Sequence, residues 1–323
     1  MNSFGTKYRI SIFGESHGKS VGVLIDGCPS GIALTEKDFT VDLLKRKSGA
    51  KGTTPRIEGD IQQIKSGVFN EKTTGAPILI EFENENTRSK DYSNLVKHPR
   101  PSHADFVAEK KYQSFQDYRG GGHFSGRITL GLVAAGVIAK KIISDINIEA
   151  TLTEVAGRKD IETAIDKALK NKNSVGGIIE CIAKDLPIGL GEPFFNSIES
   201  QISSLVFSVP GIKAIEFGAG FAGTQMQGSE FNDLIIDKKG KTKTNNSGGI
   251  NGGISNGNDL VFRVAVRPTA SISLAQETYN FEHQKIEALK INGRHDVCIA
   301  LRVPVIIEAV TAIVLADLHL TQL

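Results

Sequence analysis

The segment Arg119-Gly-Gly-Gly-His-Phe-Ser-Gly-Arg127 carries the strongest local signal for chemistry in the sequence. Consecutive glycines let backbone N–H groups converge on an anion, and a predicted helix from about Ile128 to Ile143 follows directly. The N-terminus of that helix adds partial positive charge, and the two arginines add guanidinium groups that bind phosphate or carboxylate through paired hydrogen bonds. The segment therefore predicts an anion-binding site; the alternative is a surface turn with solvated arginines.

Three histidines and one aspartate lie in loops or at predicted helix starts, where ionisable groups can transfer protons near neutral pH. They are His17 in the first loop, His103 at the start of a helix, and His295 and Asp296 in the sequence GRHD. No pair has the spacing of a helical metal site such as H-x-x-x-H, so the sequence predicts no protein-bound catalytic metal.

Two more segments could carry chemistry. RPTAS, residues 267–271, follows a predicted strand and offers the charge of Arg267 and two hydroxyls to an anion. GESHG, residues 14–18, matches the nucleophile elbow G-x-S-x-G, which would make Ser16 the nucleophile of a hydrolase. The elbow requires a strand, a sharp turn and a helix, whereas residues 19–27 are typical of a second strand. The hydrolase is therefore kept as an alternative.

These residues need a scaffold, and the hydrophobic pattern predicts a mixture of strands and helices. The strands are predicted at Tyr8–Phe13, Val21–Ile25, Ile61–Phe69, Ile78–Phe82, Ile148–Val155, Ile178–Ala183, Ile212–Phe217 and Leu260–Val266. The other helices are predicted after a capping box at Thr35, after a Ser102 cap over residues 103–115, and at Ile161–Asn171, Ile198–Phe207 and Val305–Leu318. The helix after Ile128 is apolar almost all round, which is typical of a helix at the protein centre. The sequence therefore predicts an α+β fold in one domain over residues 1–323.

Composition narrows the classes of partner. The 323 residues include 38 Lys plus Arg and 36 Asp plus Glu, so the net charge is +2. This balance gives no general attraction to nucleic acid or to an anionic membrane, and the sequence predicts neither as a partner. The apolar segment 303–318 carries Glu308 and Asp317, which argues against a membrane span. Three isolated cysteines and the lack of a signal-peptide pattern predict a cytoplasmic protein.

Taken together in chain order, these segments resemble the chorismate synthase family. The matching segments are GESHG at 14–18, RPSHADF at 100–106, RGGGHFSGRIT at 119–129, GGINGGIS at 248–255, RPTASI at 267–272 and GRHD at 293–296. The resemblance implies a single-domain β-α-β sandwich with buried central helices between sheets, and a homotetramer. It implies conversion of 5-enolpyruvylshikimate 3-phosphate to chorismate and phosphate by an anti-1,4-elimination. Reduced FMN would be required although the reaction has no net redox change.

The resemblance also assigns roles to individual residues. His17 would donate a proton toward the departing phosphate, His103 would hold the reduced flavin in its protonation state, and Asp296 would help to remove the C6 proton. Substrate would be bound by Ser16, Arg46, Arg119 and Arg127. FMN would be bound by His123, Phe124, Ser125, Gly252, Arg267, Pro268, Thr269, Ala270, Ser271 and Arg294, and Arg46 also matches a position associated with NADP. Family members often have Arg where this chain has His123, and Lys where it has Arg267.

The source of the reducing equivalents is a separate expectation. NADPH is the candidate reductant, and because the sequence shows no reductase domain, we expect an external flavin reductase as a partner. Two other functions stay open at this point. One is the serine hydrolase at Ser16, and the other is a non-catalytic protein that binds FMN or phosphate.

Overall fold

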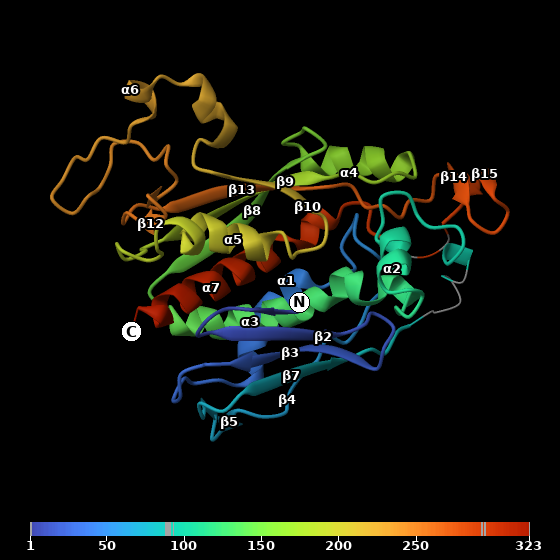
Figure 1. Cartoon of the computed structure of the whole chain (residues 1–323), viewed down its shortest axis with the longest axis horizontal. Coiled ribbons are helices and arrows are strands. Elements are labelled where there is room, and N and C mark those ends of the chain that lie inside the picture. The colour runs from blue at the N-terminus through green and yellow to red at the C-terminus, as the bar shows by residue number, and fades with distance from the viewer. Residues whose placement is uncertain (1, 88–91, 93, 292, 294, 323) are drawn as a thin grey trace.

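Two antiparallel sheets enclose a layer of helices (Figure 1). The structure is a computed structural model that describes residues 2–87, 92, 94–291, 293 and 295–322. One sheet has the strand order β1-β2-β3-β7-β4, formed by Ser3–Phe4, Arg9–Gly14, Ser20–Asp26, Ile78–Glu83 and Gln62–Ile64. The other has the order β10-β13-β9-β8, formed by Ile212–Phe217, Leu260–Val266, Gly177–Lys184 and Asn147–Val155. The predicted α+β sandwich with helices between the sheets is confirmed.

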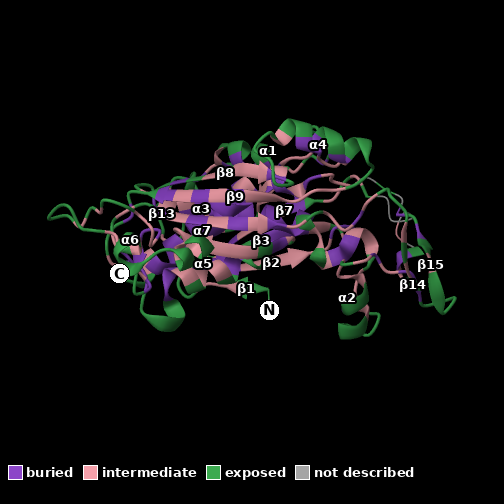
Figure 2. Ribbon diagram, turned by 90° about the horizontal axis from the view of Figure 1, so that it is seen from above, coloured by how far each residue is buried: buried purple, intermediate pink, exposed green. Residues whose placement is uncertain are grey.

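The helices at the centre are α3 (Thr129–Ile142) and α7 (Pro304–Thr321), which pack against each other. Residues 129–139 of α3 and 305–318 of α7 are all buried. Figure 2 shows buried positions, in purple, gathered at the middle of the molecule, where α3 and α7 are labelled. Close approach depends on small side chains, because a Cβ added to Gly136 would lie 2.5 Å from the Cα of Ala309. The prediction of an all-round buried helix after Ile128 is confirmed.

α7 is long and apolar enough to span a membrane, but 78% of this apolar stretch is buried inside the protein. Its two carboxylates have partners within the fold. Glu308 pairs with the Nζ of Lys140 at 3.0 Å. Asp317 accepts the backbone N–H groups of Thr6, Lys7 and Tyr8 at 2.9, 2.6 and 2.8 Å. α7 is therefore a core helix whose last turn holds the N-terminal segment.

Asp317→Ala is expected to lower the free energy of unfolding by about 2 kcal/mol, since it removes a charged acceptor from a buried amide and two partly exposed ones. Urea denaturation measures the change. Asp317→Asn is the matched variant, because its remaining oxygen keeps part of the contact, and it should lose less than the alanine variant. Equal stability of all three proteins would show that the carboxylate does not hold the N-terminal segment.

The outer elements agree with the sequence in part. α1 (Thr40–Arg46) follows a 3₁₀ turn, η1 (Glu36–Phe39), with the predicted capping box between Thr35 and Asp38. Helices α4 (Ile161–Lys170) and α5 (Ile198–Val206) also lie where predicted.

Two predicted elements are wrong. The expected strand Ile61–Phe69 is broken at Gly67, which has a φ of +81°, so that β5 (Val68–Phe69) pairs with β6 (Lys72–Thr73) instead. The expected helix over 103–115 shrinks to α2 (Asp105–Lys111). Ser102 does not cap it, because Ser102 has a φ of +58° and Ala104 takes the cap position.

A peripheral hairpin was not predicted at all. Strands β14 (Gln276–Asn280) and β15 (Lys285–Leu289) form it at the same end of the molecule as α2 (Figure 1). It contacts α2 through the stacked rings of Phe106 and Phe281, whose centroids are 5.4 Å apart. The glycine-rich segment 248–255 forms the hairpin of β11 (Ile250–Asn251) and β12 (Ile254–Ser255) at the opposite end of the sandwich. Next to it, residues 218–247 project outward with η6 (Gly220–Gln225) and α6 (Gly228–Phe231).

Candidate functional site

A cavity of about 270 Å³, here called the main cavity, lies where β13 ends and where α3 and α7 begin. Its ionisable lining consists of Arg46, Arg56, Glu58, Asp60, Arg100, His103, Arg127, Arg267, His295, Asp296 and Arg302. An apolar part of its wall comes from Val209, Pro210, Ile299, Val303 and Ile306. Arginines outnumber carboxylates among these residues, so the main cavity suits an anionic ligand that also has an apolar ring.

The three glycines of the RGGG segment form part of η3 (Arg119–Phe124) and all have positive φ, at 61°, 82° and 53°. A Cβ on Gly120 would lie 2.5 Å from Cδ2 of His17, and one on Gly121 would lie 3.5 Å from Cε1 of His103. The N–H of Ser16 donates to the carbonyl of Gly122 at 3.0 Å. Glycine is required here because the backbone runs close to two histidines in a conformation that other residues rarely adopt.

Asp60 joins two buried arginines at one side of the main cavity. Its carboxylate lies 2.7 Å from Nη1 of Arg127 and 3.5 Å from Nη1 of Arg46. Burial, followed by the charge of Arg302, lowers the pKa of Arg46 to about 9, while Asp60 opposes the shift. Arg46 therefore stays charged at neutral pH. Asp60 itself has a φ of +53°, a strained conformation for a residue with a side chain.

Both arginines also donate hydrogen bonds to other groups of the protein. Arg127 donates to the side chain of Asn84 and, at 3.0 Å, to the carbonyl of Glu83. Arg46 donates to Oγ1 of Thr129 at 3.0 Å, at the start of α3. A guanidinium group has five N–H donors, so each arginine keeps donors for a ligand beyond these contacts.

The side chain of Asp296 is held in place on another side of the main cavity. Its Oδ1 accepts the backbone N–H of Thr54 at 2.9 Å, and Nη1 of Arg302 donates to the same oxygen at 3.3 Å. Arg302 belongs to η7 (Ile299–Arg302) and also donates to the carbonyl of Arg46 at 2.9 Å. No group of three His, Cys, Asp or Glu residues within the described ranges is placed to hold a metal ion.

His17 lies behind the wall that Ser16 and Gly120 form and is only 7% exposed. Burial, followed by the charges of Arg56 and Arg119, lowers the pKa of His17 to about 4, while Asp117 and Glu58 oppose the shift. The ring is therefore neutral at pH 7 unless an anion binds beside it. Arg56 also donates to Oγ of Ser16 at 3.1 Å.

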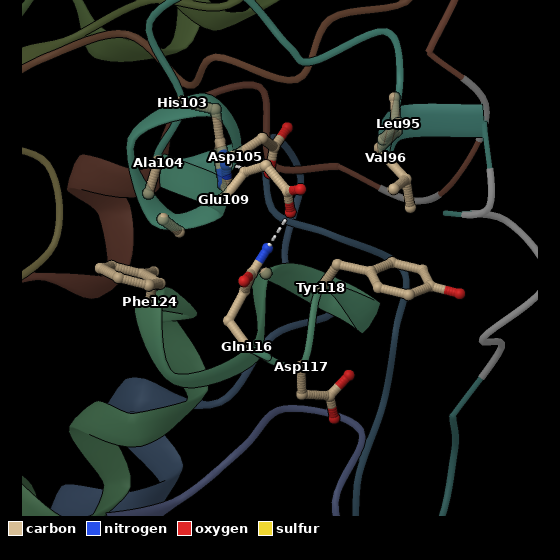
Figure 3. A pocket seen from close by; sticks show the side chains of 12 residues that line it. Leu95, Val96, His103, Ala104, Asp105, Glu109, Gln116, Asp117, Tyr118 and Phe124 are labelled. Carbon is tan, nitrogen blue, oxygen red and sulfur yellow. Dashed lines mark hydrogen bonds and ion pairs between the residues drawn. The ribbon is translucent and has the colours of Figure 1, made fainter. Parts of the chain in front are cut away.

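His103 lies at the entrance of α2 between the main cavity and a smaller pocket of about 30 Å³. Figure 3 shows His103, Asp105 and Glu109, which lie in or just before α2, on one side of the smaller pocket. Gln116, Asp117 and Phe124 lie on the other side. Nδ1 of His103 is 2.7 Å from Oδ1 of Asp105. A histidine bound in this way can hold a proton at a fixed position on its ring.

Comparison with known proteins decides the family. The sequence profile of chorismate synthase matches residues 8–320. The chain belongs to the chorismate synthase family. It is 62% identical over 323 residues to a chorismate synthase of Chitinophaga pinensis, with 100% of this chain and 97% of that protein covered. It is 45% identical over 351 residues to one of Dehalococcoides mccartyi, with 99% and 96% covered. A crystal structure of a chorismate synthase, 26% identical, matches with a TM-score of 0.75 over 99% of this chain and 94% of that one.

Most positions that match chorismate synthase motifs converge on the main cavity, although they are far apart in the sequence. Those that line it are Ser16, Arg46, His103, Phe124, Ser125, Arg127, Arg267, Thr269, Ala270, Ser271 and Asp296. Pro210 and Gly211, which lie outside the matching segments named above, line it too.

Other predicted chorismate synthase site residues lie elsewhere in this chain. Arg119 makes two 2.8 Å hydrogen bonds to Asp117 and is not among the described lining residues. The ring nitrogens of His123 lie 2.8 Å from the carbonyl of Gly14 and 3.1 Å from Oδ1 of Asn2. Gly252 lies in the turn between β11 and β12, and Pro268 also lies outside the described lining. Arg294 falls outside the described residues.

Several charged residues of the main cavity were missed by the sequence analysis. They are Arg56, Glu58, Asp60, Arg100 and Arg302. The signal for the first three was local: PRIEGD, residues 55–60, places charged side chains at alternate positions without a hydrophobic period. Arg100 lies inside a segment that matched the family, but nothing in its position showed that it is buried.

Proposed function

We propose that the protein catalyses the elimination of phosphate from 5-enolpyruvylshikimate 3-phosphate to give chorismate, with reduced FMN bound in the same cavity. The observation that carries the proposal is the convergence of the family's motif residues on one arginine-rich cavity. The substrate has a phosphate and two carboxylates, and the guanidinium groups that line the main cavity match this charge.

Each residue has a defined task in the proposed reaction. Arg46 and Arg127 bind and orient the anionic groups, and Ser16 adds a hydroxyl near Arg56. His17 gives a proton to the departing phosphate once that group has raised the pKa of its ring. Asp296, a carboxylate held by Thr54 and Arg302, accepts the proton from C6.

The turn at 267–271 fits a flavin. Oγ1 of Thr269 is buried at the main cavity and has no hydrogen-bond partner among the described residues. This hydroxyl can therefore donate a hydrogen bond to a ligand or accept one from it. Arg267, Ser271, Phe124 and Ser125 also line the main cavity and would hold the cofactor. When bound, reduced FMN supplies electron density to the substrate ring as phosphate leaves. His103, which lines the same cavity, would hold the bound flavin in its protonation state.

The proposal also covers the assembly of the enzyme, its location and the source of its reduced flavin. We propose a cytoplasmic homotetramer whose flavin is reduced at the expense of NADPH by an external flavin reductase. Exposed apolar residues on the projecting segment 218–247, among them Phe221, Leu234 and Ile235, support association with further copies of the chain. Sedimentation analysis tests the assembly, and a monomer at micromolar concentration would contradict it.

An anaerobic assay tests the reaction. Phosphate release from 5-enolpyruvylshikimate 3-phosphate with chemically reduced FMN is expected, together with the absorbance of chorismate. Oxidised FMN serves as the control and should give no product. Binding of both ligands without phosphate release would favour the non-catalytic binding protein and overturn the proposal.

The serine hydrolase is the weaker candidate on geometric grounds. GESHG lies between the paired antiparallel strands β2 and β3, so the helix that a nucleophile elbow requires does not follow. Ser16 is fully buried, and its Oγ accepts a hydrogen bond from Arg56. Labelling by an activated-serine probe that disappears in Ser16→Ala would favour the hydrolase.

A further inference from the structure

Arg100 is 6% exposed and lies between His103 and the turn at 267–271. Its Nε and Nη2 each donate to one oxygen of Asp105 at 2.7 Å, and its Nη1 donates to Oγ of Ser271 at 2.9 Å. The Asp105 oxygen that accepts from Nη2 is also 2.7 Å from Nδ1 of His103. One side chain thus joins the histidine to the turn.

The position of the proton on His103 follows from these contacts. Burial opposes ionisation of Asp105, but hydrogen bonds from Arg100 and His103 hold its pKa well below the usual range, so the carboxylate only accepts. Nδ1 of His103 therefore carries a hydrogen and donates it to Asp105. Nη2 of Arg100 has two hydrogens, one of which goes to the carboxylate at 2.7 Å, and it also lies 3.1 Å from the same Nδ1. The shorter 2.7 Å contact of Nδ1 is the one to the Asp105 carboxylate, which has no hydrogen to give, so this contact requires the hydrogen on Nδ1.

The other ring nitrogen faces the RGGG segment. Nε2 of His103 lies 3.7 Å from the position of a Cβ on Gly121, and His103 lines the main cavity. Nε2 is thus the atom at which a proton can be held for a ligand.

We propose that Arg100 is a positioning residue, which fixes Asp105 so that His103 keeps its proton on Nδ1 and presents Nε2 to the main cavity. The contribution to catalysis rests on the proposed function, whereas the position of the proton does not. The planar guanidinium is needed because it reaches two oxygens of Asp105 and the hydroxyl of Ser271 together, which the single ammonium of a lysine cannot do.

Other ionisable groups face His103 from the elements around it. Glu109, Asp117 and Tyr118 line the smaller pocket, and Arg56, Glu58 and Arg267 line the main cavity. Within the described residues, the His103 ring makes its close polar contacts with Asp105 and Arg100. The effect of Arg100 is therefore separable from the wider field of the cavity.

Arg100→Lys tests the proposal through the ¹⁵N NMR shifts of the His103 ring at pH 8, which report where the proton lies. The wild type should show hydrogen on Nδ1, and the variant should show a mixture of both ring forms. With activity established, kcat should fall about tenfold and KM less than twofold, because misplacement of a proton-transfer group affects turnover.

Two further variants complete the test. Asp105→Asn should move the proton of His103 to Nε2, since the amide can donate to Nδ1. Arg263→Lys, which alters a remote ion pair of 2.7 Å with Glu216, is the matched control and should change neither the ring nor kcat. Retention of the Nδ1 proton in Arg100→Lys would overturn the proposal even if kcat fell. Absence of phosphate release in every protein would count against the proposed function and leave the ring measurement valid.

Discussion

His17→Ala is expected to lower kcat for phosphate release by about 10²- to 10⁴-fold, the usual contribution of a positioned general acid. The affinity for reduced FMN should stay within about twofold, because His17 lies behind Ser16 and Gly120 and not in the turn at 267–271. Stopped-flow measurement under anaerobic conditions gives kcat, and fluorescence titration gives the FMN affinity.

The depressed pKa of His17 gives this prediction a second readout. At about 4, the ring is neutral at pH 7, so it can act as an acid only if the bound phosphate raises its pKa. Binding of inorganic phosphate near pH 6 should therefore be coupled to proton uptake, which calorimetry in buffers of different ionisation enthalpy measures. His17→Ala should remove that uptake.

The same shift has a consequence for stability. Because the pKa is 6.5 in the unfolded chain and about 4 in the fold, the unfolded state binds more protons between these values. Stability from this group is present above pH 6.5 and is lost as the pH falls toward 4. His283→Ala is the control, since that ring is largely exposed and pairs with Glu287 in the peripheral hairpin.

For the kinetic prediction, an unchanged kcat in His17→Ala would remove the residue from the mechanism.

The sandwich was predictable because its elements bury one face at a regular period. In β13, residues 260, 262, 264 and 266 are buried and those between are partly exposed. All of its residues except Arg263 are apolar, and this apolar run predicted the strand. The peripheral hairpin lacks this signal. In its strands only Asn280 and Leu289 are buried, so QETYN and KIEAL have no clear hydrophobic face. Its place depends on contacts with α2 that are remote in sequence.

The site was predictable where one short segment carries several functional groups. RGGG and GRHD supplied residues of the main cavity or beside it directly. Asp60 and Arg302 were missed because their role comes from meeting Arg46 across the fold, which no local pattern encodes. Arg119 bonds locally instead. Its Nε and Nη2 donate to Asp117, two residues earlier, and its binding of substrate, which the family resemblance implies, stays a prediction.

Arg127→Ala is expected to weaken both the fold and substrate binding. It leaves Asp60, which is 7% exposed at its side chain, with only the longer 3.5 Å contact to Arg46, and it deprives Asn84 of a donor. Removal of one partner from a buried ion pair lowers the free energy of unfolding by about 3 kcal/mol. The lost positive charge should raise KM for the phosphorylated substrate about tenfold.

Double substitution separates these two effects. In Asp60→Asn, Arg127 keeps its charge without a partner, so stability should fall while the positive charge offered to substrate stays. If the pair acts as a unit, Arg127→Ala combined with Asp60→Asn should cost less than the sum of the single changes in urea denaturation. KM should nevertheless stay high in the double variant, because the cation is gone.

Arg263→Ala provides the scale against which Arg127→Ala is judged. Its pair with Glu216 is partly exposed, at 39% and 24% of the two side chains, so its loss should cost less than about 1 kcal/mol and leave KM unchanged. An Arg127→Ala protein that resembles Arg263→Ala in both measurements would show that the buried pair neither stabilises the cavity wall nor binds the substrate. A large loss of stability with normal KM would assign Arg127 to the scaffold alone, and leave the anion to Arg46, Arg56 and Arg302.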